Sequence, residues 1–187
     1  MLRAAIYIGS NSVRLLVADV NGDEFKPLFK RINTTRLHEG LSENGMLFGE
    51  PAERTRAAIA DFARQARDAG VSGENIRAFA TSAVRDAENG GDFIADVHAE
   101  CGVNIRLLTG QQEARFAFFA AALPGGECGV IDIGGASTEM ICGSGADVRA
   151  AYSAQMGAVG RRYVGRTYAR NKRAGAKTRH RRGIAAA

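Results

Sequence analysis

Two segments of the chain share an arrangement of residues that could bind an anion. Residues 6–17 read IYIGSNSVRLLV, and residues 131–142 read IDIGGASTEMIC. Each contains an apolar strand, a glycine turn with small polar side chains, and a second apolar strand. Backbone N–H groups in such a turn can point toward one spot and bind an anion. The repeat predicts a duplicated fold that holds a phosphate chain between two hairpins.

The candidate phosphate-binding residues are the turn glycines and their polar neighbours. They are Gly9, Ser10, Asn11, Ser12, Gly134, Gly135, Ser137 and Thr138. A tight hairpin alone would also use glycine, but the doubled occurrence with hydroxyl side chains favours phosphate binding. Arg85 is a further candidate, because a guanidinium makes a forked, permanently charged contact with phosphate. The alternative for Arg85 is a surface ion pair with Asp86 or Glu88.

Three carboxylates could act on a bound phosphate. Glu113 falls in the first turn of a predicted helix, where a carboxylate could act on a bound anion. The alternative is that Glu113 only caps this helix, in which Thr109 and Gln112 could form a capping box. Asp132 interrupts an apolar strand, so we expect it to meet a cation, a donor or water in a cleft rather than lie at an exposed edge. Together with Glu139 it could ligate Mg²⁺, with substrate phosphates completing the coordination.

Strands alternate with helices along the chain, which predicts an α/β fold with a mixed sheet. We expect strands at 4–8, 13–20, 25–33, 75–80, 104–108, 130–134, 138–142 and 148–155, and helices at 51–69, 93–100 and 111–123. Residues 36–49 are expected to form a loop, and 81–91 a polar connection. Phe116, Phe118 and Phe119 are expected to share one face of the third helix.

Composition and charge set outer bounds on function. The chain has 187 residues, of which 45% are hydrophobic and 24% charged, values typical of globular proteins. It has no apolar run of membrane-spanning length and no leader-like start, and its three cysteines are widely spaced. We therefore expect a cytoplasmic protein with no membrane partner, no disulfides and no zinc site.

The positive charge is concentrated in the last part of the chain. The net charge is +5, yet ten Lys or Arg residues lie between Arg161 and Arg182, and no acidic residue follows Asp147. We expect residues 161–187 to form a basic, disordered tail with no selected role. The alternative is an arm that binds nucleic acid or another polyanion.

Several segments resemble the Ppx/GppA family of exopolyphosphatases and guanosine pentaphosphate phosphatases. They are IGSNSVRLLV at 8–17, TTRLHEGL at 34–41, FATSAVRDAENG at 79–90, LLTGQQEARFAF at 107–118 and VIDIGGASTEM at 130–140. The resemblance implies the actin, Hsp70 and sugar-kinase fold, which is ribonuclease H-like. It implies a first lobe at 1–124 and an incomplete second lobe at 125–160, ahead of the tail.

The resemblance also implies a function and roles for particular residues. The expected reaction is Mg²⁺-assisted attack of water on the terminal phosphorus of inorganic polyphosphate or guanosine pentaphosphate, as in the bacterial stringent response. Glu113 aligns with the catalytic glutamate of the family, and Arg85 with an arginine at its substrate cleft. Asp132 corresponds to an acidic residue near the attacking water and the metal, and Glu139 is the second candidate metal ligand.

The chain departs from the family pattern at three points. Tyr7 stands where the family has an aspartate, and it aligns with Asp132 in the internal repeat. Ala136 replaces a loop glycine, which is harmless only if φ is negative there. Beyond residue 160 the family pattern ends, so we expect a truncated or frame-shifted chain with an exposed apolar sheet face and a tendency to form homodimers. Two alternatives stay open, a non-catalytic polyanion-binding fragment and a phosphotransferase of the same fold.

Overall fold

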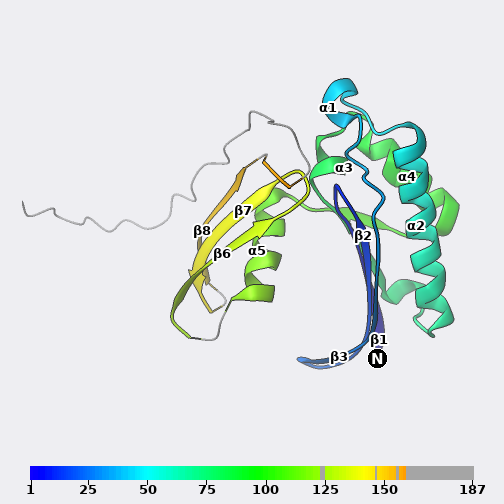
Figure 1. Cartoon of the computed structure of the whole chain (residues 1–187). Helices are drawn as coiled ribbons and strands as arrows, with labels where there is room; N and C mark the ends of the chain where they lie inside the picture. The colour runs from blue at the N-terminus through cyan, green and yellow to red at the C-terminus, as the bar shows by residue number, and fades with distance from the viewer. Residues whose placement is uncertain (123–124, 146, 155, 159–187) are drawn as a thin grey trace, which may run out of the picture.

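The protein is represented by a computed structural model that describes residues 1–122, 125–145, 147–154 and 156–158 (Figure 1). Its strands form two sheets. One has five strands in the order β3-β2-β1-β4-β5, and the other has three strands in the order β6-β7-β8. The predicted division at residues 124 and 160 stays a prediction, and the predicted basic tail lies outside the described residues.

The five-stranded sheet is mixed, as predicted. Strands β1 (Leu2–Ile8), β2 (Val13–Asn21) and β3 (Glu24–Asn33) form an antiparallel meander. Strands β4 (Ile76–Ala80) and β5 (Ile105–Leu107) run parallel to β1. This order places the carboxyl ends of β1, β4 and β5 at one edge of the sheet, where the first glycine turn also lies.

One face of this sheet is covered by helices. Helices α2 (Gly49–Asp68) and α4 (Gly90–Cys101) lie on the same side of β1 and β2 in Figure 1. Alternate strand residues such as Ile6 and Val13 point to that side, and they belong to one buried core with Ile59 of α2. Burial of apolar residues on alternate strand positions fixes the register, because a shift of one residue would expose them all.

The second sheet is antiparallel and is covered on one face by a helix. It consists of β6 (Glu127–Ile133), β7 (Thr138–Ser144) and β8 (Asp147–Ala154). Helix α5 (Gly110–Ala121) lies along it in Figure 1, and Phe118 packs on Ile141 of the central strand. The start of α5 is therefore held between the two sheets.

Two short helices occur in segments expected to be irregular. Helix α1 (Leu41–Asn44) interrupts the predicted loop, and α3 (Ser82–Asp86) lies in the predicted polar connection. A helix of four or five residues is too short to show a hydrophobic period. Helix α3 carries Arg85, one of the candidate phosphate-binding residues.

The expected aromatic face of α5 was wrong. Phe118 is fully buried, whereas Phe116 is 49% exposed and Phe119 is 51% exposed. Residues two positions apart point in nearly opposite directions on a helix, so Phe116 and Phe118 cannot share a narrow stripe. Phe116 instead contacts Phe79 of β4, with a distance of 6.2 Å between ring centroids.

Candidate phosphate-binding and catalytic site

The two glycine hairpins have the same turn geometry. The Gly9 amide donates to the Ser12 carbonyl at 3.0 Å, and the Gly134 amide donates to the Ser137 carbonyl at 2.8 Å. A Cβ on either glycine would approach that carbonyl oxygen closely, to 3.3 Å at Gly9 and to 3.0 Å at Gly134. The internal repeat seen in the sequence is therefore confirmed as a structural repeat.

The turn amides differ in how they are used. The Gly9 and Gly134 amides donate hydrogen bonds within their own turns. The amides of Ser10, Asn11 and Gly135 have no hydrogen-bond acceptor among the described residues. These three remain candidates for phosphate contact. Ala136 does not have a positive φ, so the replacement of a glycine is harmless there.

Part of the hydroxyl set is buried and already bonded. The Ser10 hydroxyl lies 2.9 Å from the Ser82 hydroxyl, and both side chains are buried. Thr138 donates its hydroxyl to the Met156 carbonyl, and Ser12 is also buried. In this conformation these hydroxyls support the turns, and the free amides are better placed to meet a ligand.

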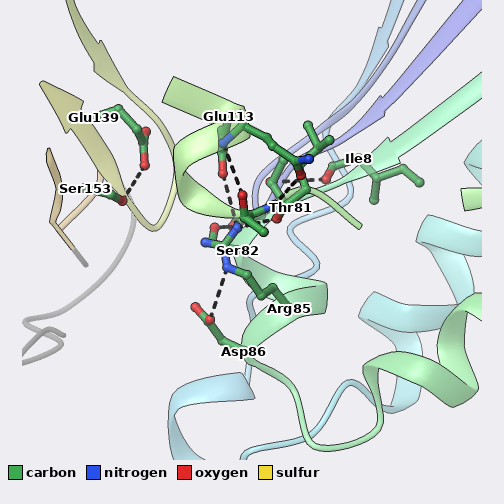
Figure 2. A network of polar contacts seen from close by, with 12 residues as sticks. Ile8, Thr81, Ser82, Arg85, Asp86, Glu113, Glu139 and Ser153 are labelled. Atoms are coloured by element: carbon green, nitrogen blue, oxygen red, sulfur yellow. Dashed lines mark hydrogen bonds and ion pairs between the residues drawn. The ribbon is translucent and has the colours of Figure 1, made fainter. Parts of the chain in front are cut away.

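Glu113 lies in the first turn of α5 with both carboxylate oxygens engaged. Tyr7 of β1 donates its hydroxyl to Oε1 at 3.1 Å, and Arg85 Nη1 of α3 lies 3.4 Å from Oε2. Glu113 is 8% exposed. Figure 2 shows its carboxylate directed at the arginine from the opposite side of the site. Residues far apart in sequence thus converge on one carboxylate.

Burial raises the pKa of Glu113 to about 7, and the nearby Glu139 carboxylate contributes to the increase. The Arg85 charge and the Tyr7 hydrogen bond act in the opposite direction. A carboxylate with a pKa near neutral can accept a proton from water and release it again. The capping box of Thr109 and Gln112 is present, so helix capping is already supplied by other residues.

Arg85 forms the ion pair with Asp86 that was its alternative role, and it also reaches the candidate site at Glu113. Its Nη1 donates to the Leu108 carbonyl at 2.9 Å and contacts Glu113, while its Nε lies 3.7 Å from Asp86. The arginine is therefore fixed in the site by a backbone carbonyl and flanked by two carboxylates, as the labelled side chains in Figure 2 show. A guanidinium held in this way can meet a phosphate without first losing side-chain entropy.

Asp132 and Glu139 lie directly opposite each other on β6 and β7. Asp132 is exposed on an edge strand, yet it is close enough to Tyr7 and Glu139 to raise the pKa of both groups, and its contact with a cation, a donor or water stays a prediction. The exposure arises because β6 has a neighbour on one side only. Glu139 is 1% exposed and accepts a hydrogen bond of 2.7 Å from Ser153, and burial raises its pKa.

Asp132 and Glu139 are the candidate ligands for Mg²⁺. No group of three or more potential ligand side chains gathers within the described ranges. Two facing carboxylates still fit the chemistry of Mg²⁺, which usually takes one or two protein carboxylates and completes its shell with water and phosphate oxygens. Asp132 and Glu139 would be the residues that hold it.

Tyr7 holds the position in the first hairpin that Asp132 holds in the second. Tyr7 is paired with Arg14 in the register that pairs Asp132 with Glu139. Burial raises the pKa of the Tyr7 phenol, with the Glu113 charge as the next cause, so the group is neutral and can donate. The sequence identified the departure at Tyr7 but carried no signal that its hydroxyl would reach Glu113.

Ser82 and Ser153 are further residues of the site that the sequence did not single out. Ser82 bonds the first turn through Ser10, and Ser153 bonds Glu139. Ser82 lies within the segment that carries the family resemblance, while Ser153 is an unremarkable serine of a strand. Only the register of β8 on β7, which places Ser153 opposite Glu139, reveals its role.

Comparison with known proteins identifies the family. A model of the Ppx/GppA phosphatase family matches residues 16–164. The chain is similar to a solved Ppx/GppA family member from Aquifex aeolicus, with 33% identity and a TM-score of 0.73 over 84% of this chain and 52% of that one. It is also similar to an exopolyphosphatase from Cytophaga hutchinsonii, with 25% identity and a TM-score of 0.78 over 84% of this chain and 51% of that one.

The chain belongs to the Ppx/GppA family. It spans about half the length of these solved relatives. The predicted fold class, an actin-like α/β fold with a mixed sheet, is confirmed. The ethanolamine utilization protein EutJ from Carboxydothermus hydrogenoformans shares the fold alone, at 13% identity and a TM-score of 0.50 over 84% of this chain and 53% of that one. Among the described helices, none is both long and apolar enough to cross a membrane.

Proposed function

We propose that the protein hydrolyses terminal phosphoanhydride bonds and releases phosphate from inorganic polyphosphate or guanosine pentaphosphate. The observation that carries the proposal is the convergence of Tyr7, Arg85 and Glu113 beside two matching glycine turns. A buried carboxylate with a pKa near 7, next to a fixed guanidinium, is suited to proton transfer beside a phosphate. Family membership supports the same reaction class.

The residues of the site have distinct roles in this reaction. Free amides of the two turns hold phosphate oxygens, and Arg85 balances the charge of the terminal phosphate. Glu113 orients a water molecule and takes its proton as the water oxygen bonds to phosphorus and the anhydride bond breaks. The shortened chain leaves with the bonding electrons. Positioning and charge balance supply most of the rate gain in such reactions.

Mg²⁺ bound by Asp132 and Glu139 would neutralise charge on the phosphates. The chemical basis is the pair of facing carboxylates, which repel each other unless a cation lies nearby. Ser153 orients the carboxylate of Glu139 through its hydrogen bond. The role of this metal pair remains part of the proposal.

Phosphate release from long-chain polyphosphate, measured with and without Mg²⁺, tests the proposal. We expect metal-dependent release that falls by about a hundredfold or more in Glu113→Gln, the loss typical of removing a general base. Glu53→Gln, the same change at an exposed glutamate of α2, serves as the matched control. Release that survives Glu113→Gln would contradict the assigned base. No release from the native chain, followed by release from Tyr7→Asp, would locate the defect at Tyr7.

Self-association and a cytoplasmic location also remain proposals. Ile131, Ile133 and Met140 are exposed on the outer face of the second sheet, which supports the expected homodimer. Sedimentation of the chain at several concentrations tests this, and a strictly monomeric chain would contradict it. The proposed location rests on the small number and wide spacing of the cysteines, which are free thiols in the structure.

A further inference from the structure

The face of the five-stranded sheet that α2 and α4 do not cover carries cations in register. One cross-strand row contains Arg14, Tyr7, Phe79 and Arg106 on β2, β1, β4 and β5. The next row contains Lys30, Leu16, Ala5 and Arg77, and Arg3 follows on β1. Together, Arg3, Arg14, Lys30, Arg77 and Arg106 define what is here called the cationic sheet face.

These five cations are exposed and unbalanced. None of them forms an ion pair with a carboxylate in the part of the chain that the structure describes, and all five side chains are exposed. The outward positions of these rows include no aspartate or glutamate. By contrast, Arg54, Arg56 and Arg64 on the helix-covered side are paired with carboxylates. Three arginines on the helix-covered side are therefore ion-paired, whereas the five cations of the other face are not.

The cationic sheet face is continuous with the candidate active site. Tyr7 lies in its first row and donates a hydrogen bond to Glu113. The row that contains Arg77 lies two residues further along the strands than the row of Tyr7. Arg3 lies four residues from Tyr7 on β1. Because a strand rises about 3.3 Å per residue, the face extends roughly 13 Å from the row of Tyr7 to that of Arg3. A cavity of about 440 Å³ at the β4 and β5 edge of the sheet is lined in part by Arg77 and Arg106, together with Glu74.

We propose that the cationic sheet face binds the distal phosphates of an inorganic polyphosphate chain whose terminal phosphate lies at Glu113. The inference rests on the proposed function and extends it, because it makes long polyphosphate the preferred substrate. The matching feature is charge: a row of unpaired cations leads away from the catalytic carboxylate, and each distal unit of polyphosphate carries a negative charge. An apolar covering segment would leave these cations unpaired.

The aromatic residues on this face favour polyphosphate over single-stranded nucleic acid. Base stacking needs an open ring face. Tyr7 and Phe79 are only partly exposed, the Tyr7 hydroxyl is committed to Glu113, and Phe116 packs edge-on against Phe79. The exposed groups are the guanidinium and ammonium heads, which contact phosphates without reading bases.

Binding of phosphate chains to a non-hydrolysing variant tests the inference. In the Glu113→Gln background, titration calorimetry would compare long-chain polyphosphate with tripolyphosphate at several salt concentrations. The test variant carries Arg3→Gln, Lys30→Gln and Arg77→Gln. The matched control carries Arg56→Gln, Arg64→Gln and Arg67→Gln on α2, which removes the same number of positive charges from the other side. Thermal melts verify that both variants fold.

We expect the test variant to bind long chains about tenfold more weakly, while the control changes less than about twofold. The salt slope of long-chain binding should fall by about 0.7 for each removed contact, as found for single-stranded polyanions. Affinity for tripolyphosphate should fall by less than that for long chains in the test variant, because a chain of three phosphates reaches the second row at most and does not extend to Arg3.

Several results would overturn the inference. One is an equal loss of long-chain affinity in the test and control variants, and another is an equal loss of affinity for long chains and for tripolyphosphate. A third is the absence of long-chain binding when the five cations are unchanged. The last is an RNA homopolymer that binds more tightly and displaces polyphosphate. Failure of the proposed function looks different. In that case long chains bind the cationic sheet face of the native protein, but no phosphate is released.

Discussion

The hydroxyl of Tyr7 lies 3.1 Å from Oε1 of Glu113, although the two residues are 106 positions apart in the sequence. In the second hairpin the equivalent position holds Asp132. An aspartate at this point would add a negative charge beside Glu113, whereas a neutral phenol donates a hydrogen bond to it. At this position the chain therefore lacks a carboxylate oxygen that could bind a metal, and it has instead a hydrogen bond that orients Glu113.

Replacing Tyr7 with Phe should raise the pKa of Glu113. The hydrogen bond from Tyr7 lowers this pKa, so its loss leaves burial and the Glu139 charge less opposed. The acidic limb of the pH profile of phosphate release should therefore move to higher pH by up to about one unit. Tyr152→Phe, on the outer face of β8, is the matched control and should leave the profile in place. An unchanged profile in Tyr7→Phe would show that the phenol does not tune the base.

Removal of the Arg85 guanidinium should weaken both phosphate binding and the positioning of Glu113. Arg85→Ala loses the contacts with Glu113 and with the Leu108 carbonyl, so we expect kcat/KM to fall by about tenfold to a hundredfold. Arg85→Lys keeps the charge but not the fork, and should recover only part of the loss. Arg64→Lys on α2, an exposed arginine on the helix-covered side of the sheet, serves as a control for the loss of a fork away from the site. Full activity of Arg85→Lys would mean that charge alone suffices.

The sequence predicted the sheets, the long helices and the duplicated turns, because each depends on local patterns. Alternation of apolar residues located β1 and β2, and glycine with hydroxyl residues located both turns. Contacts between distant segments were beyond its reach. The exposure of Asp132 depends on β6 lying at an edge, and the Tyr7 contact depends on how α5 leaves β5.

Glu113→Gln should stabilise the folded protein at alkaline pH. Burial raises the pKa of Glu113 from its ordinary 4.5 to about 7 in the folded state. The folded state therefore holds the proton more tightly than the unfolded state, and stability falls as pH rises from about 4.5 to 7. Above that window the full penalty applies, about 3 kcal/mol, and the opposing effect of Arg85 is already contained in the raised pKa. Denaturant unfolding at pH 5 and pH 8 measures this, with the gain confined to the higher pH. Glu50→Gln on the exposed start of α2 is the control, and an equal gain at both pH values would contradict the burial argument.

Gly157→Ala should disrupt the second glycine turn and leave the first intact. A Cβ at Gly157 would lie 2.3 Å from the Gly135 carbonyl oxygen and 2.5 Å from the Ala136 nitrogen, far inside normal contact. The backbone must move, and the free amide of Gly135 moves with it. We expect a loss of polyphosphate binding with little change in the unfolding of the first sheet, because its core does not include this turn. Gly73→Ala is the matched control, since a Cβ there meets no atom within 4 Å. Normal polyphosphate binding by Gly157→Ala, measured in the Glu113→Gln background, would show that the second turn does not hold phosphate.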